Sequence, residues 1–233
     1  MMDNFDLAGM AYTASVWIVP VLLAVTFHEA AHGFVANLLG DATAKNLGRV
    51  TFNPLKHIDP FGTVLLPALL LLGSGGRFVF GFAKPVPVNF SRLNRPRRDM
   101  VLVAAAGPGA NLILAVLSAV ALTGLSALPP EGARWVAQNL VNSVWINLIL
   151  AVFNMLPIPP LDGGRVAVGL LPDVLARPLA RLERVGFLII LGGVFLLPLI
   201  GDQIGMDLNV FMWLVGVPAS ALMNFLFAGL GLA

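Results

Sequence analysis

Five long apolar segments constrain this chain more than any other feature of its sequence. They cover residues 11–39, 100–128, 134–156, 185–201 and 207–231, and most reach the roughly 20 helical residues that cross about 30 Å of hydrocarbon. Only 11% of the residues are charged and 58% are hydrophobic, whereas soluble domains carry roughly 25% charged residues. The sequence predicts an all-α membrane protein: a polytopic helical bundle of about five to six transmembrane segments in one domain, residues 1–233.

The composition also excludes several kinds of chemistry and partner. Without cysteine, the chain has no disulfide, no thiolate metal ligand and no cysteine nucleophile. The net charge of +2 comes from basic residues beside apolar segments, where membrane topology explains them better than nucleic acid does. Asp3 and Asp6 stand where a signal peptide would carry basic residues, so the first apolar segment is expected to be retained.

Residues 61–74 form a shorter apolar segment that either spans the membrane or re-enters it. The segment has a proline inside and is short for a crossing. Because cytoplasmic loops are enriched in lysine and arginine, the basic residues favour one topology. Re-entry places 13 of the 14 basic residues on one side and leaves Arg134 alone on the other, whereas a crossing gives 10 and 4. We therefore predict re-entry, with residues 40–98 and 157–184 in the cytoplasm and the N-terminus outside.

The motif HEAAH lies inside the first apolar segment. On a helix His28 and His32 share one face, so their imidazoles converge, while Glu29 sits one position round. Such a pair supplies two nitrogen ligands to zinc, and the adjacent carboxylate can take a proton from metal-bound water. The alternative is a pair of buried polar residues that bond to neighbouring helices, but ionisable groups in a membrane segment are costly and usually functional.

A catalytic zinc needs a third protein ligand, for which the sequence offers two main candidates. His57 lies in a polar, proline-bounded loop, where a surface or hydrogen-bonding role is more common. Asp162 follows a long apolar segment and a proline-rich run, and two glycines after it allow the backbone to pack closely. Asp162 is the better candidate, although alone it could also be a helix N-cap.

The chain resembles the site-2 proteases, a family of intramembrane zinc metalloproteases. The resemblance rests on HEAAH at 28–32, GFAKPVPVN at 81–89, AGPGAN at 106–111 and NMLPIPPLDGG at 154–164. It implies that His28, His32 and Asp162 hold one Zn²⁺ per chain, that Glu29 is the catalytic base and acid, and that Asn154 supports the transition state or orients the site. The chain is most similar to compact members that carry neither a PDZ domain nor a C-terminal regulatory domain.

The resemblance implies an intramembrane zinc endopeptidase that cleaves a transmembrane protein substrate within or near its membrane segment. Together with the apolar segments and the distribution of basic residues, it favours a multi-pass protein of a prokaryotic plasma membrane, with the active site toward the cytoplasm. One alternative is a divalent-metal transporter that uses the same four residues, although transporters often show internal repeats and this sequence has none. The other alternative is an inactive membrane chaperone of the same fold. The sequence leaves the oligomeric state and the identity of the substrate open.

Two segments are expected to be extended and to form a small cytoplasmic β element, or a re-entrant hairpin, near the site. Residues 77–89 have strand propensity interrupted by glycine and prolines, which suits an edge, and residues 47–53 are the second candidate. A sheet edge would receive an unwound substrate by strand addition. On this hypothesis Val79→Pro or Val50→Pro impairs cleavage and leaves the zinc content unchanged. The alternative is a pair of surface connectors.

Overall fold

The computed structural model describes residues 7–73 and 81–232. Its α-helices are α1 (Leu7–Leu38), α2 (Thr43–Asn46), α3 (Leu66–Gly73), α4 (Pro96–Leu122), α5 (Pro130–Asn154), α6 (Asp162–Leu170), α7 (Asp173–Arg181), α8 (Glu183–Leu191), α9 (Leu197–Ile204) and α10 (Val217–Gly229). Short 3-10 or π-helical turns are η1 (Pro54–Lys56), η2 (Pro60–Leu65), η3 (Phe90–Arg92), η4 (Leu125–Ala127), η5 (Gly192–Leu196) and η6 (Met212–Gly216). The described residues are therefore helical throughout, joined by loops.

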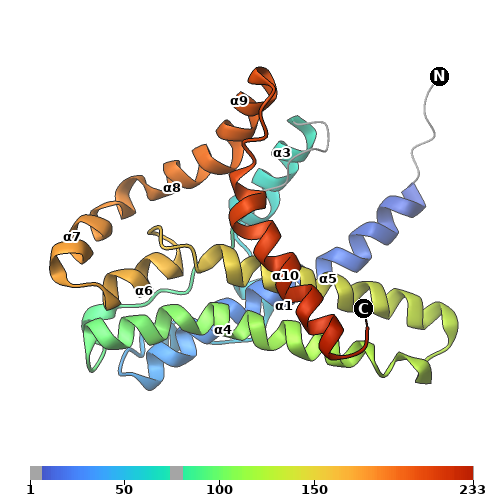
Figure 1. Ribbon diagram of the computed structural model, residues 1–233. Helices are drawn as coiled ribbons and strands as arrows, with labels where there is room; N and C mark the ends of the chain where they lie inside the picture. The colour runs from blue at the N-terminus through green and yellow to red at the C-terminus, as the bar shows by residue number, and fades with distance from the viewer. Residues whose placement is uncertain (1–6, 74–80, 233) are drawn as a thin grey trace.

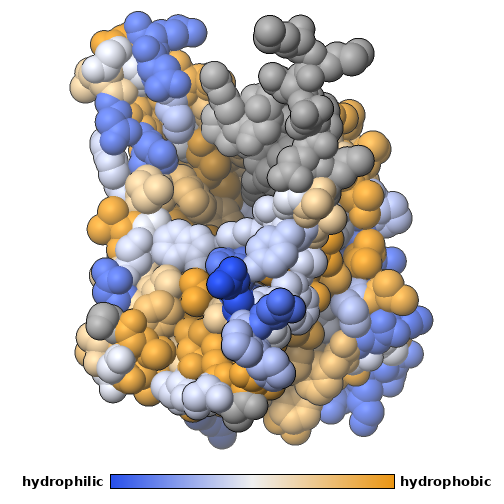
Figure 2. Space-filling model, turned by 90° about the vertical axis from the view of Figure 1, so that its right-hand side faces the viewer, coloured by the Kyte–Doolittle hydropathy of each residue, from blue (hydrophilic) through white to orange (hydrophobic). Residues whose placement is uncertain are grey.

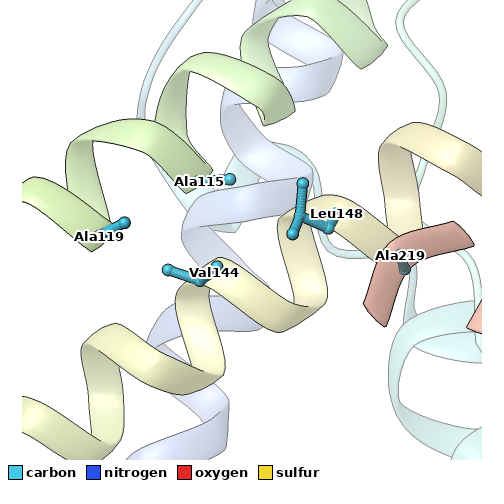
Figure 3. Packing of buried hydrophobic residues seen from close by; sticks show 5 residues of the cluster. All are labelled: Ala115, Ala119, Val144, Leu148 and Ala219. Atoms are coloured by element: carbon cyan, nitrogen blue, oxygen red, sulfur yellow. The ribbon is translucent and has the colours of Figure 1, made fainter. Parts of the chain in front are cut away.

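Three long helices, α1, α4 and α5, pack against one another and form the centre of the molecule (Figure 1). Small residues let them approach closely, because helices in lipid associate by packing rather than by a hydrophobic driving force. On α4, Ala115 and Ala119 lie one turn apart and face Val144 and Leu148 of α5, and Ala219 of α10 completes this buried cluster (Figure 3). α6 packs on α4, which holds the start of α6 beside the central bundle.

Within the described residues, five helices are long and apolar enough to cross a membrane, as the sequence predicts. They are Ala8–Leu38, Pro96–Leu122, Pro130–Asn154, Glu183–Ile204 and Met212–Gly229. The fourth, which is marginal in the sequence, is a continuous helix because α8, η5 and α9 follow one another without a break. Large apolar side chains point outward from these helices, and Figure 2 shows hydrophobic residues over much of one face with hydrophilic residues gathered in patches. Such a surface suits lipid contact.

The shorter apolar segment is helical in the part that the structure describes. It consists of η2 and α3, which together run from residue 60 to residue 73, about 21 Å of helix against about 30 Å of hydrocarbon. In Figure 1, α3 and α9 lie on the same side of the α1/α4/α5 bundle. Re-entry of this segment and the sidedness of the loops stay predictions.

The expected β element is absent from the described residues, and the reason is visible at residues 47–53. Gly48 has φ +62°, and the Arg49 N–H donates to the Ala44 carbonyl, a pattern that closes the C-terminus of α2. Asn53 then caps η1 by accepting the Leu55 N–H. Because the first cap uses backbone N–H groups of this segment and the second begins a new helical turn at its end, the expectation of a strand at 47–53 is wrong, and the Val50→Pro prediction loses its basis. Val79 lies outside the described residues.

Residues 81–89 also form no strand, but their backbone is tied to the rest of the molecule at alternate positions. The N–H of Phe82 donates to the Gly62 carbonyl at 2.9 Å, and the N–H of Lys84 donates to the His57 carbonyl at 3.0 Å. Pro85 and Pro87 have no N–H to donate. The segment therefore runs from η2 toward α1, with the N–H groups of Phe82 and Lys84 already paired.

Asp41 anchors the far end of this segment to the end of α1. Its side chain is fully buried and accepts the Asn89 N–H at 2.6 Å and both the N–H and the hydroxyl of Thr43. Burial raises the pKa of Asp41, but these hydrogen bonds lower it by more, so the pKa lies below its ordinary value of 3.8. The ionised carboxylate therefore stabilises the folded state.

We expect Asp41→Asn to lower the free energy of unfolding by about 2 kcal/mol at pH 7, because the amide places a donor against backbone donors. The folded-state pKa is depressed, so the stabilisation is present above pH 3.8 and is lost as the pH falls through the folded pKa. Thermal unfolding in detergent should show a gap between wild type and variant that closes at low pH. Asp207→Asn, in an exposed turn, is the matched control. A gap that stays constant down to pH 3 would contradict the assignment.

Candidate metal centre

His28 and His32 lie one turn apart on α1, and their Nε2 atoms point at the same place. The two Nε2 atoms are 3.1 Å apart, and Oδ2 of Asp162 lies 3.2 Å from the first and 3.3 Å from the second. All three side chains are buried. Ligand atoms of the three residues lie within 4.8 Å of one another, which is the spacing of a set that can share one ion.

The first turn of α6 positions the side chain of Asp162. Asp162 is the first residue of the helix, and the N-cap position belongs to Leu161, so the side chain is not used as a cap. A Cβ at Gly163 would overlap the Met155 carbonyl, and a Cβ at Gly164 would overlap the backbone of Pro159. The two glycines therefore let α6 press against the proline-rich run, which brings the carboxylate to the histidines.

The donor set fits a cation. The Nδ1 atom of His32 lies 2.7 Å from the Val103 carbonyl, which can only accept, so the ring proton is on Nδ1 and Nε2 presents a lone pair. Oδ2 of Asp162 is buried and accepts no hydrogen bond. Gly107 of α4 backs the site, because a Cβ there would overlap Nε2 of both histidines. Two nitrogens and one carboxylate oxygen in an enclosed space match the ligands of zinc in peptidase sites.

Electrostatics keep the carboxylate of Asp162 ionised. Burial raises its pKa, but His28 and His32, in the state in which their Nε2 atoms carry protons, lower it by more, so the pKa lies well below its usual range. A metal ligand must be deprotonated to bind. At neutral pH this carboxylate is therefore ready to coordinate.

Glu29 and Asn154 line the same cavity as the three converging side chains. The cavity has a volume of about 300 Å³ and is enclosed by α1, α4, the end of α5, the start of α6 and residues 85–90. Asn154 donates its amide to the Leu150 carbonyl at 3.0 Å, one turn back on α5. The structure therefore gathers every residue that the sequence assigns to the site around one space.

One oxygen of Glu29 is held by residue 86. The Val86 N–H donates to Oε2 of Glu29 at 2.6 Å. Arg49, which is buried, donates to the carbonyl of Lys84 at 2.7 Å and so fixes the backbone just before Val86. Gly33, one turn after Glu29 on α1, allows this approach, since a Cβ there would lie 3.0 Å from a methyl of Val86. The 81–89 segment thus orients the carboxylate.

His57 does not join the cluster. Its Nε2–H donates to the Thr51 carbonyl at 3.0 Å, and the residue is 2% exposed. It lines a separate cavity between α1, α5, η2 and α3. The structure therefore brings Asp162, rather than His57, to the two histidines.

The sequence gives little sign of several residues that support the site. Gly107 and Asn111 belong to AGPGAN, where helix packing is the first interpretation, yet Gly107 leaves room at both Nε2 atoms and Oδ1 of Asn111 lies 2.6 Å from Nδ1 of His28. Arg49 belongs to none of the motifs described above. A usable signal exists for Asn111, because a fully buried amide in an apolar helix needs a specific partner.

Together these features define a membrane protein with a two-histidine, one-carboxylate metal centre and a neighbouring glutamate, which is the ligand pattern of a zinc peptidase. A family model described as Peptidase family M50 matches residues 16–133 and 132–199. The chain therefore belongs to peptidase family M50, and it is a zinc metalloprotease with a His-His-Asp metal-binding set. The resemblance to site-2 proteases is confirmed.

The names of two relatives agree with this assignment. The chain is 41% identical over 178 residues to "Putative zinc metalloprotease YwhC" of Bacillus subtilis (strain 168). The aligned region covers 75% of the chain and 77% of that protein. It is 34% identical over 173 residues to "Putative zinc metalloprotease Rip2" of Mycolicibacterium smegmatis, covering 72% of the chain and 62% of that protein. The chain thus spans less than two thirds of the Rip2 length. No solved structure matches the chain.

Proposed function

We propose that the protein is an endopeptidase that hydrolyses a peptide bond within or near the membrane segment of a membrane-protein substrate. The observation that carries this proposal is the position of the metal centre. His28 lies ten residues before the end of α1 at Leu38, about 15 Å along a helix that is long enough to cross the membrane. A bond cleaved there lies at membrane depth.

In this proposal His28, His32 and Asp162 hold the metal and Glu29 moves the proton. A zinc ion in this set supplies a Lewis acid that polarises the scissile carbonyl and lowers the pKa of water. Glu29 accepts a proton from the attacking water and returns it to the leaving nitrogen. The Val86 N–H holds one oxygen of Glu29, which leaves the other to carry the proton. Asn154 lines the cavity and in this proposal supports the developing oxyanion or orients the site.

The substrate must present an extended backbone to this cavity, because a helix hides its carbonyls in hydrogen bonds. We therefore propose a substrate whose membrane helix is locally unwound. We also propose a cytoplasmic site, in a multi-pass protein of a bacterial plasma membrane, from the distribution of basic residues. The role of residues 77–89 in receiving substrate stays a prediction.

The test uses proteoliposomes that contain the full chain and a reporter protein with one transmembrane helix. We expect cleavage of a reporter whose helix carries Gly and Pro near its centre, weaker cleavage of an all-Leu helix, and loss of both after removal of zinc with a chelator. Restored zinc should restore cleavage. Zinc uptake into the vesicles without any cleavage would instead support the metal-transporter alternative, and neither uptake nor cleavage would support the inactive chaperone.

A further inference from the structure

A row of buried polar side chains crosses the central bundle and ends at His28. Ser118 of α4 and Ser143 of α5 share a hydrogen bond of 2.8 Å. Nδ2 of Asn147 donates to the backbone carbonyl of Ser143 at 2.8 Å, and Oδ1 of Asn147 accepts from Nδ2 of Asn111 at 2.7 Å. Oδ1 of Asn111 then meets Nδ1 of His28 at 2.6 Å. Three helices are linked in this way.

The orientation of both amides follows from backbone carbonyls, which can only accept. Nδ2 of Asn111 also donates to the Ala24 carbonyl at 3.1 Å, so the amide cannot turn over without setting two oxygens against each other. Asn147 is fixed in the same way by the Ser143 carbonyl. Only Oδ1 of Asn111 is left to face His28. The ring proton of His28 must therefore lie on Nδ1.

We propose that Asn111 and Asn147 are positioning residues for the metal centre: they hold the imidazole of His28 with its proton on Nδ1 and its Nε2 lone pair toward Asp162. Asn111 is 0% and Asn147 1% exposed, so water does not replace either partner. His32 obtains the same tautomer from a backbone carbonyl alone, whereas His28 depends on these side chains. The inference rests on the metal-binding part of the proposed function and does not require peptide hydrolysis.

The chain offers a matched control on the same helix. Asn142 of α5 is also buried, at 4% exposure, and its amide donates to the Val16 carbonyl of α1 at 2.9 Å. It resembles Asn147 in residue type, helix and burial but has no link to His28 among its described hydrogen bonds. A residue that only joins helices should behave like Asn142 when replaced.

The experiment measures zinc affinity of the purified full chain in detergent by competition with a chromophoric chelator. We expect Asn111→Leu to weaken zinc binding about 10–100-fold, the usual cost of losing a partner that orients a metal ligand. Asn147→Leu should weaken it in the same direction but less, because Oδ1 of Asn111 remains. Asn142→Leu should bind zinc like wild type. Asn111→Asp keeps an acceptor for His28 and should recover most of the affinity, even if its thermal stability falls.

A second measurement reads the ring protons directly. The chain has three histidines, so histidine labelled with ¹⁵N gives a simple spectrum. In metal-free wild-type protein, at a pH high enough that the ring signals no longer change with pH, we expect the proton on Nδ1 of His28 and His32 and on Nε2 of His57. Asn111→Leu should change the signals of His28 and leave His57 unchanged.

Two results would overturn the proposal. One is equal zinc affinity in Asn111→Leu and Asn142→Leu, each checked for folding by its thermal transition. The other is a wild-type His28 that carries its proton on Nε2. Failure of the proposed peptidase function would show differently, as a wild-type protein that binds zinc with the expected dependence on Asn111 but cleaves no reporter.

Discussion

Glu29→Gln should abolish cleavage of a membrane reporter while one zinc per chain remains bound. The amide cannot accept a proton from water, and loss of a general base costs roughly 10²- to 10⁴-fold in rate. The three metal-binding side chains are untouched, and the new side chain can still accept the Val86 N–H through its oxygen. Reporter cleavage in proteoliposomes and zinc content by atomic absorption measure the two effects separately.

Glu131→Gln is the control for this prediction, because Glu131 is exposed in the first turn of α5. It should retain both activity and zinc. If Glu29→Gln loses its zinc, the residue supports the metal centre rather than the proton transfer. If it keeps more than about a tenth of the wild-type rate, another group is the base.

Asp162→Ala should lose both zinc and activity. The substitution removes one of three converging ligand atoms and leaves two imidazoles that alone make an incomplete site. Zinc affinity should fall by more than the roughly 100-fold that loss of an orienting partner costs. Chelator competition gives the affinity, and addition of excess zinc should restore little of the cleavage.

Asp202→Ala, at an exposed position of α9, tests whether any lost aspartate has this effect. Full zinc occupancy and near-normal turnover in Asp162→Ala would show that the third ligand is another residue. His57 would be tested next. In the structure, however, its Nε2–H donates to the Thr51 carbonyl, and His57 lines a different cavity. His57→Ala is therefore expected to keep its zinc.

Some features of the site follow from local sequence because helix geometry is short-range. Two histidines four residues apart on a helix share a face, so the convergence of His28 and His32 needs only that residues 28–32 be helical. The five long helices follow for a similar reason, since an apolar run of this length must satisfy its backbone internally. Asp162 is predicted as the third ligand from the resemblance of its motif to the family and from the two glycines that follow it.

The wrong expectation concerns residues 47–53, where strand propensity competed with local caps. Val50, Thr51 and Phe52 favour strands one residue at a time. However, the cap at Gly48 uses the N–H groups of Gly48 and Arg49 to close α2, and the Thr51 carbonyl accepts from the ring of His57, so these backbone groups are not available to a strand. The error shows that propensity decides little when neighbouring cap residues already pair the backbone.

The membrane class, the long helices and the two-histidine motif can be predicted from the amino-acid sequence, because each depends on residues close together in the chain. The atoms that support that motif are known only from the three-dimensional packing. Asn111 reaches His28 across 83 positions, Val86 reaches Glu29 across 57 and the Val103 carbonyl reaches His32 across 71. No periodicity or spacing encodes such contacts, since they depend on how closely α1, α4 and the 81–89 segment pack, and that packing is set by small residues such as Gly33 and Gly107.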